Sequence, residues 1–423
     1  MTTNWIHNKH IPLWCILLLT VVVFSPTFGN GFQMGWDDQW MVMNGFTVQN
    51  INYNYIKELF CTPFNGQWGP LNQLMYTCIY SLFKYNPCAF HTASLILHLV
   101  NITIVYYGLS KILTDCTNWS KERIFYTSTF VTLFFGIHPL QVETVAWISA
   151  SKILMCSTFY LLATLSLIQY LHSSRLRWYL ATILLFIMSY LSKEQAVTYP
   201  LFATVLCLWY KIKPTNSRFW FILIPLYLIA SIQCAHEIFI VANYNLYIKG
   251  DTFVWWERII LMFYSFATYV FNWIIPNKLN WMYAFPIEPK GDIPLWLTLY
   301  PVLLVVVFST CWTWLKKKHV LSALAFVLIH LLLVLHITVL PRAAVIADRY
   351  MYLSIIGLNF LLAYFIFNET SLGKHKKTII IFVIGITLLY GGLSFIRVFD
   401  WDNSENLRAS IENIMMYYKY FYC

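Results

Sequence analysis

The sequence predicts an all-α polytopic membrane protein. Hydrophobic residues make up 59% of the 423 residues and charged residues only 11%, whereas soluble domains average about 45–50% and about 25%. The mean hydropathy is +0.61. The apolar residues are gathered in runs of about 20, the length at which a helix crosses a bilayer, so we expect helices rather than a barrel. Aromatic residues, at 19%, suit the many helix ends at the membrane surfaces.

About eleven apolar segments are predicted to span the membrane. They cover residues 11–29, 89–113, 124–137, 152–171, 176–191, 196–210, 219–236, 293–315, 320–340, 350–368 and 378–396. The first segment also fits a secretory signal peptide, because Lys9 and His10 precede its apolar run. In either case the residues that follow it lie on the outer side.

The charge distribution supports this threading. With the N-terminus in the cytoplasm, most Lys and Arg residues fall on the inner side and almost every acidic residue on the outer side, as the positive-inside rule expects. The net charge of +10 therefore reports on orientation, and no basic and aromatic cluster on a soluble face indicates nucleic-acid binding. A crossing at Ile259–Ile275 would move Lys316–Lys318 outside, so we interpret this segment as a re-entrant or interfacial helix. A twelfth span is the alternative.

The chain is predicted to be a single transmembrane domain over residues 1–423, with no soluble domain. Its longest outer segments are residues 30–88 and 237–292. The first contains an amphipathic helix, predicted from the helical spacing of Trp68, Leu71, Leu74, Met75, Ile79, Leu82 and Phe83. The ten Cys residues are scattered without a CxxC pair, which argues against a zinc or disulfide framework.

An acid pair, Asp37 and Asp38, directly follows the first span between Trp36 and Trp40. Neighbouring carboxylates repel, which raises the pKa of one of them and makes it a better general base. The alternative is an ordinary solvated pair of loop acids. Mg²⁺ or Ca²⁺ would need further oxygen ligands that the sequence does not show, so we expect no required metal or cofactor.

Other ionisable residues lie at the outer ends of the predicted spans, where a charge is costly unless it is paired or lines a wet cavity. Arg349, with Arg342 upstream, could hold a phosphate through its N–H donors. Its alternative role is an ion pair with Asp348. The remaining candidates for substrate binding are His138, Glu143, Lys152 and Lys193. His98, on an apolar helix with Asn101, instead indicates an interhelical hydrogen bond.

Six segments occur in an order that resembles one family. They are the Trp-Asp-Asp loop, Gly66–Leu71, His138–Trp147 with Lys152, Leu191–Pro200, Tyr283–Pro286 and Ala347–Leu353. The chain resembles, from about residue 30 to 410, the transmembrane O-mannosyltransferases with tetratricopeptide repeats and their bacterial relatives, within the GT-C glycosyltransferases. The resemblance implies a GT-C-type helical bundle that transfers a sugar from a polyprenyl-phosphate donor to a hydroxyl acceptor. It also implies that Asp37 is the base, Asp38 its partner, and Arg349 the contact of the lipid phosphate.

Single displacement with one carboxylate base would invert the anomeric centre. Mannose is the expected sugar and protein Ser or Thr the expected acceptor, with a glycan acceptor as the alternative. The bacterial inner membrane is favoured, with a periplasmic site, and the endoplasmic reticulum membrane with a lumenal site is the alternative.

The chain departs from the family pattern at three places. Relatives usually carry a basic or His residue where Gly69 stands, and Glu-Arg where this chain has Ala150-Ser151. The repeats do not follow the membrane domain here, so we expect a separate subunit to present the acceptor.

Three other functions stay open. A lipid-linked glycan transporter would carry ionisable groups deep inside its spans, an oligosaccharide ligase would share the architecture, and a silent membrane scaffold would lack activity.

Overall fold

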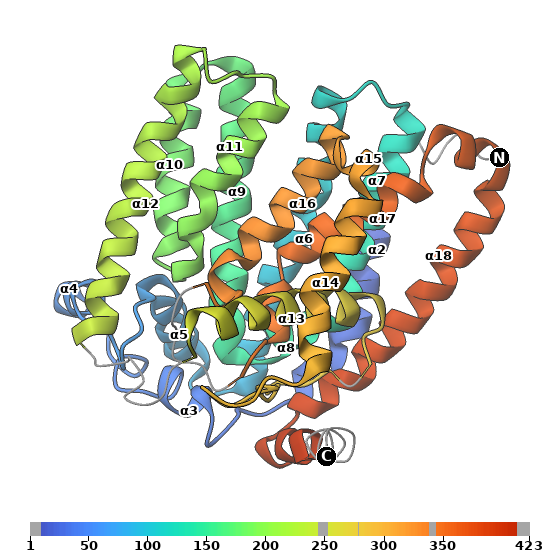
Figure 1. Ribbon diagram of the computed structural model, residues 1–423. Helices are drawn as coiled ribbons and strands as arrows, with labels where there is room; N and C mark the ends of the chain where they lie inside the picture. The colour runs from blue at the N-terminus through green and yellow to red at the C-terminus, as the bar shows by residue number, and fades with distance from the viewer. Residues whose placement is uncertain (1–9, 244–252, 278, 338–343, 413–423) are drawn as a thin grey trace.

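The computed structural model describes residues 10–243, 253–277, 279–337 and 344–412, and these contain α-helices and 3₁₀ helices but no β-strand. The all-α prediction is therefore confirmed. Each predicted span corresponds to a helix (Figure 1): α2 His10–Phe24, α6 Pro87–Cys116, α7 Lys121–Ile137, α9 Ser151–Ser173, α10 Leu176–Tyr190, α11 Tyr199–Trp209, α12 Ser217–Asn243, α14 Leu295–Thr310, α16 Lys318–Leu331, α17 Ser354–Ile366 and α18 Glu369–Val398.

Within the described residues, five helical stretches are long and apolar enough to cross a membrane. They are His10–Gly29, Pro87–Cys116, Ile148–Ser173, Ser217–Asn243 and Leu372–Trp401, and four shorter apolar helices accompany them. The chain is thus a polytopic membrane protein by helix length and composition, while the number of crossings stays a prediction.

One end of the bundle, here called the loop end, carries most of the short elements. They are η1 Ser25–Gly29, α3 Asp37–Met41, α4 Tyr53–Cys61, α5 Pro70–Phe83, η2 Pro139–Gln141, α8 Val142–Ala146, η3 Ile148–Ala150, η4 Glu194–Thr198, α13 Trp255–Ile274, η5 Leu332–Val334, η6 Asp348–Met351 and η7 Phe399–Trp401. Backbone hydrogen bonds join distant segments here, including Leu71 N to Leu191 O at 3.2 Å and Val345 N to Tyr283 O at 2.9 Å. The predicted outer segments therefore meet at one end.

The opposite end, here called the basic end, holds the short connections between helices and α15 Trp312–Leu315. The Nζ of Lys318 donates to the carbonyl of Cys116 at 3.4 Å, which joins the ends of α16 and α6. The Nε2 of His172 lies 2.6 Å from Asp115, which joins α9 to α6. The Lys and Arg residues predicted to face the cytoplasm flank these contacts.

Buried polar side chains tie the long helices together beneath the loop end. The Nδ1 of His98 lies 2.8 Å from the hydroxyl of Tyr352, and its Nε2 lies 3.0 Å from the carbonyl of Gly136. The side chain of Asn101 donates to the carbonyl of Leu154 at 3.0 Å. Interhelical hydrogen bonds of this kind satisfy polar groups that hydrocarbon cannot, and the prediction for His98 is confirmed.

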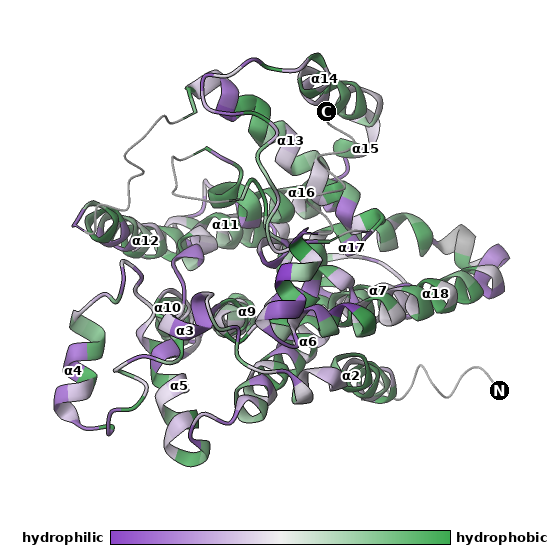
Figure 2. Ribbon diagram, turned by 90° about the horizontal axis from the view of Figure 1, so that it is seen from below, coloured by the Kyte–Doolittle hydropathy of each residue, from purple (hydrophilic) through white to green (hydrophobic). Residues whose placement is uncertain are grey.

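Two helices of the loop end lie across the direction of the long helices in both views, α5 and α13 (Figures 1 and 2). The orientation of α13 matches the interfacial interpretation of Ile259–Ile275. In α5 the polar residues Asn72 and Thr77 are buried, whereas Leu82 and Phe83 are exposed. Met75 and Ile79, which belong to the predicted apolar stripe, pack against the protein, so only the last turn of α5 presents apolar side chains to the outside, where lipid could cover them.

The crossing of α16 and α17 depends on Gly357. A Cβ at this position would lie 2.7 Å from Val327 Cγ2 and 2.9 Å from the carbonyl oxygen of Ala323. We expect Gly357→Ala to destabilise the protein by about 1–3 kcal/mol, because backbone must move to admit the methyl group. The matched control is Gly385→Ala in α18, where nothing lies within 4 Å and the helix gains roughly 0.5–1 kcal/mol. Thermal melting in detergent measures the stability of both variants. Equal melting temperatures for Gly357→Ala and Gly385→Ala would contradict the close approach of α16 and α17.

Candidate active site at the loop end

The first predicted outer segment, residues 30–88 and here called the first outer loop, is fixed to the rest of the loop end by Asp38. The carboxylate of Asp38 is fully buried. One oxygen accepts the backbone N–H of Gln33 at 2.9 Å. The other accepts the backbone N–H of Ser149 at 2.9 Å and the Ser149 hydroxyl. Because Ser149 belongs to η3, these bonds hold the start of α3 against the segment that leads into α9.

The environment of Asp38 changes the pKa of its carboxyl group. Burial raises the pKa of Asp38 to about 6, and the neighbouring carboxylate of Asp37 adds a smaller effect in the same direction. The sequence suggested that repulsion within the pair would raise the pKa of one member. The structure identifies Asp38 as that member, with loss of water rather than repulsion as the main cause.

Asp37 has a different environment from its neighbour. Its side chain is half-buried at the first position of α3, and among the described residues none donates a hydrogen bond to its carboxylate. Lys152 and Arg349 both interact with it electrostatically. The acid pair is therefore divided between Asp38, which anchors the loop, and Asp37, whose oxygens are available to a bound molecule beside two cations.

Arg349, in η6, is held by Glu143 of α8. The guanidinium forms an ion pair with the fully buried Glu143 carboxylate, which also accepts the backbone N–H of Arg349 at 2.9 Å. The Arg349 side chain keeps 21% of its surface exposed. It lies over the ring of Trp147, with 5.4 Å between the guanidinium carbon and the ring centroid. Glu143 thus fixes one edge of an Arg side chain that remains partly accessible.

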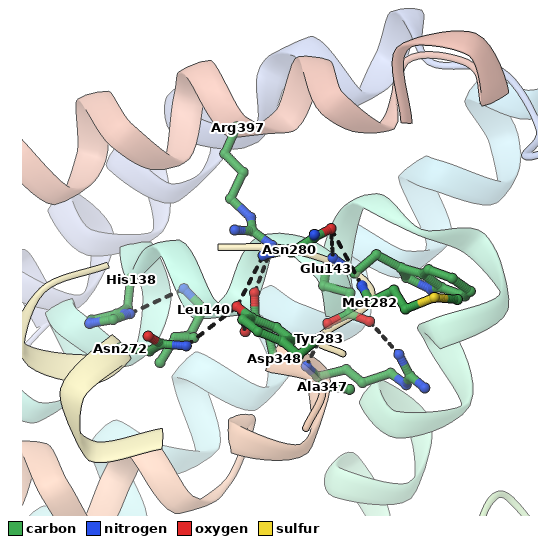
Figure 3. Close-up of polar contacts among 12 residues, drawn as sticks. His138, Leu140, Glu143, Asn272, Asn280, Met282, Tyr283, Ala347, Asp348 and Arg397 are labelled. Carbon is green, nitrogen blue, oxygen red and sulfur yellow. Dashed lines mark hydrogen bonds and ion pairs between the residues drawn. The ribbon is translucent and has the colours of Figure 1, made fainter. Parts of the chain in front are cut away.

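The alternative in which Arg349 pairs with Asp348 is wrong, because Asp348 has other partners (Figure 3). Its carboxylate accepts the hydroxyl of Tyr283 at 2.8 Å and an N–H of Arg397 at 2.7 Å. Asp348 is fully buried and Arg397 is 8% exposed. The Asp348–Arg397 pair joins α18 to the segment before α17. Arg349 therefore forms its ion pair with Glu143 and not with Asp348.

Trp side chains connect the acid pair to the arginine. The ring of Trp36 packs edge-on against Trp281 with 4.4 Å between centroids, and Trp281 lies 6.0 Å from Trp147. Trp147 in turn stacks on Trp401 at 5.3 Å. Sequence reasoning missed Trp281 and Trp401, although Trp281 lies two residues before the Tyr283–Pro286 segment. Together these ring contacts link the segment that carries the acid pair to the ring over which Arg349 lies.

A pocket of about 60 Å³ opens between the first loop and η4. Its lining combines aromatic side chains with polar ones: Trp40, Met41, Phe46, Leu59, Thr62, Phe64, Gln67, Trp68, Gly69, Pro70, Asn72, Gln73, Tyr76, Lys152, Ser192 and Glu194. The Nζ of Lys152 donates to the side-chain oxygen of Gln67 at 2.7 Å. Lys193 forms an ion pair with Glu194 at 3.2 Å. Lys152 therefore lines this pocket and also interacts electrostatically with Asp37.

One described candidate, His138, has no role in this cluster. His138 is fully buried, with its Nε2 2.9 Å from the carbonyl of Trp273 and its Nδ1 accepting the N–H of Leu140 at 3.2 Å. Both ring nitrogens are thus engaged by backbone (Figure 3 shows the bond to Leu140), so His138 positions the turn after α7 instead of contacting substrate. Arg342 lies outside the described residues. Within the described ranges, no group of three or more His, Cys, Asp or Glu residues could hold a metal ion.

The departures from the family pattern have local explanations. A Cβ on Gly69 would lie 3.1 Å from the carbonyl oxygen of Ser192, so a larger residue there requires the turn before η4 to shift. The hydroxyl of Ser151 lies 2.8 Å from that of Tyr76 and accepts from Asn72 at 3.2 Å. The first loop therefore packs closely on the bundle at both positions.

Comparison with known proteins gives a distant relationship. No family model and no solved structure matches the chain. Protein O-mannosyl-transferase TMTC4 from Mus musculus is 25% identical over 215 residues, which is 44% of this chain and 28% of that protein. The Homo sapiens protein of the same name is 25% identical over 214 residues, with the same shares of each chain. The match thus covers less than a third of each relative.

The raised pKa of Asp38 has a consequence for stability. Because the folded chain holds this proton more tightly than the unfolded chain, whose carboxyl has the ordinary pKa of 3.8, ionisation of Asp38 opposes folding. The stabilisation that the folded chain gains from holding the Asp38 proton is complete below about pH 4. It is lost as the pH rises through about 6, and this lowers the free energy of unfolding by up to roughly 3 kcal/mol.

We therefore expect Asp38→Asn to flatten the fall of the melting temperature between pH 4 and pH 6. The control is Glu405→Gln, which changes an exposed carboxylate of the same end. Parallel melting curves for wild type and Asp38→Asn across this range would contradict the assignment.

Proposed function

We propose that this chain is a membrane glycosyltransferase that transfers a hexose, with mannose favoured, from a polyprenyl-phosphate donor to a hydroxyl acceptor at the loop end. Protein Ser or Thr is the favoured acceptor. The observation that carries the proposal is the environment of Asp37, a half-buried carboxylate that no described residue engages by a hydrogen bond, held in place by its neighbour Asp38 and within electrostatic reach of Lys152 and Arg349. The distant O-mannosyltransferase relatives supply the reaction class.

The arrangement suits a single displacement. Asp37 removes the proton of the acceptor hydroxyl while the oxygen forms a bond to the anomeric carbon. The bond between that carbon and the phosphate oxygen breaks, and the phosphate keeps the electron pair. Arg349, with Lys152 nearby, offsets the charge that develops on the phosphate. One carboxylate base and attack opposite the leaving group invert the anomeric centre.

The residues around the pair position it. Asp38 sets the direction of α3 through Gln33 and Ser149, so the Asp37 carboxylate starts close to its place in the reaction. Glu143 holds Arg349 in position in a similar way, through its ion pair with the guanidinium and its bond to the backbone N–H. Prior placement of the reacting groups is worth several kcal/mol, because little motion remains to be restricted in the transition state.

Of the other functions, the transporter is less consistent with this geometry, whereas the ligase differs only in its acceptor. A transporter of lipid-linked glycans is disfavoured, because the clustered charges lie at the loop end rather than along the centre of the bundle. An oligosaccharide ligase would use the same groups with a glycan acceptor. We favour the exported face of a bacterial inner membrane, with a separate subunit that presents the acceptor. The endoplasmic reticulum lumen is the alternative.

Substitution of the base tests the proposal. We expect Asp37→Asn to reduce transfer of radiolabelled hexose from polyprenyl phosphate by about 10²–10⁴-fold, the usual contribution of a general base. The fold should be unaffected, since no described hydrogen bond is lost. The control, Glu405→Gln at the same end, should retain activity. Transfer that is unchanged in Asp37→Asn would remove Asp37 from the mechanism, and donor movement across vesicles that survives it would favour the transporter.

The role of Arg349 requires a conservative substitution. Arg349→Ala would leave the buried Glu143 carboxylate without its cation, which costs about 3–5 kcal/mol, so loss of activity there would be ambiguous. Arg349→Lys keeps the charge but loses the two-pronged donor geometry.

We expect Arg349→Lys to raise the KM for the donor and to lower kcat, with an unchanged KM for the acceptor. Steady-state kinetics with both substrates varied makes the distinction. A change confined to the acceptor KM would place the phosphate elsewhere.

A further inference from the structure

A second cavity lies toward the basic end, among five long helices. Its volume is about 90 Å³. The lining is almost wholly apolar and comes from α6, α9, α11, α16 and α17: Ile104, Val105, Gly108, Leu109, Ile112, Leu161, Thr164, Leu165, Phe202, Val205, Trp209, Ser322, Ala323, Phe326, Ile356, Gly357 and Phe360. Apolar cavities of this kind stay dry and accept hydrocarbon. None of these residues belongs to the candidate active site.

Aromatic rings surround this cavity where it approaches the basic end. Trp209 and Phe360 line the cavity. The His319 ring lies 5.9 Å from Trp209, and the Trp119 ring stacks nearly parallel to Phe360 at 6.2 Å. These four rings, here called the mouth, lie at the side of the cavity nearer the basic end, and Trp side chains are most common at the depth of a membrane surface.

The mouth contains polar atoms that the protein leaves unsatisfied. Trp209 Nε1 and His319 Nδ1 are buried, and neither has a hydrogen-bond partner among the described residues. A buried polar atom without a partner costs about 1–3 kcal/mol. Two of them on neighbouring rings indicate a place for a ligand that offers oxygen atoms.

Two cations flank the same rings. The Arg123 guanidinium lies 3.7 Å from the centroid of Trp119, and the Lys318 ammonium donates to the carbonyl of Cys116. Both lie close enough to His319 to interact with it electrostatically. The nearby carboxylate of Asp115 is occupied by Lys111, His172 and Tyr210. The mouth therefore presents positive charge to an incoming group.

We propose that this cavity binds one anionic phospholipid from the leaflet at the basic end. Part of one acyl chain occupies the cavity, and the headgroup phosphate lies between Arg123 and Lys318, where its oxygens accept from Trp209 Nε1 and His319. The apolar interior, the unsatisfied ring nitrogens and the cations match the tail, the phosphate oxygens and the charge of such a lipid. The site is at the opposite end from Asp37, so it does not depend on the proposed function.

Native mass spectrometry of the full chain tests the site. The protein is released from bilayers that contain equal amounts of phosphatidylcholine and phosphatidylglycerol with the same acyl chains. We expect wild type to retain one phosphatidylglycerol in preference to phosphatidylcholine. Arg123→Gln with Lys318→Gln should reduce that preference by roughly 5-fold for each cation removed. The matched control replaces Arg175 and Lys377, exposed cations of the same end, with Gln and should keep the preference.

A second variant tests the cavity without touching the charges. Val205→Trp fills the cavity from α11 and should abolish the retained lipid, while melting in detergent confirms that the helices still pack. Equal retention of the two lipids by wild type would overturn the proposal. So would retention that is unchanged in both variants, or displacement of phosphatidylglycerol by added polyprenyl phosphate, which would assign the cavity to the donor.

Discussion

The buried carboxylate of Asp38 is the constraint on which the loop end depends. It receives backbone N–H groups from Gln33 and Ser149, residues that come from the first outer loop and from the turn before α9. Burial of a carboxylate is costly unless hydrogen bonds satisfy it, so this contact is formed only when both segments are in place. The position of Asp37 follows directly, because it is the adjacent residue on α3.

The loop end is assembled from pairs that are distant in sequence. Glu143 and Arg349 are 206 residues apart, and Asp348 and Arg397 are 49 apart. In each pair a buried carboxylate holds a cation, and each pair joins different helices. The consequence is a surface whose charged groups are fixed before substrate arrives, with Asp37 a carboxylate that no described residue engages by a hydrogen bond and that interacts electrostatically with Lys152 and Arg349. Charged groups in fixed positions suit a group-transfer reaction. They suit a transporter less well, because transport of a solute requires charged groups that exchange partners.

The sequence allowed the helices to be predicted, because hydrophobic length is a local property, while the threading through the membrane stays a prediction. The acid pair lies at the same end of the bundle as the other predicted outer segments. It could not assign the partner of Asp38, since nothing near Ser149 distinguishes it from other Ser residues at helix ends. The pairing of Arg349 was predicted incorrectly for the same reason: Asp348 is adjacent in sequence, but the backbone turns it toward Tyr283 and Arg397. The Trp281 and Trp401 contacts depend on the tertiary arrangement alone.

The central claim is that Asp37 and Arg349 act on the same donor molecule. A structure determined by electron cryomicroscopy with a non-hydrolysable phosphonate analogue of polyprenyl-phosphate mannose tests it most directly. The account predicts the phosphonate against Arg349 and the anomeric carbon facing Asp37, with space between them for one hydroxyl. Density for the sugar at the basic end, or at the loop end but remote from Asp37, would contradict it.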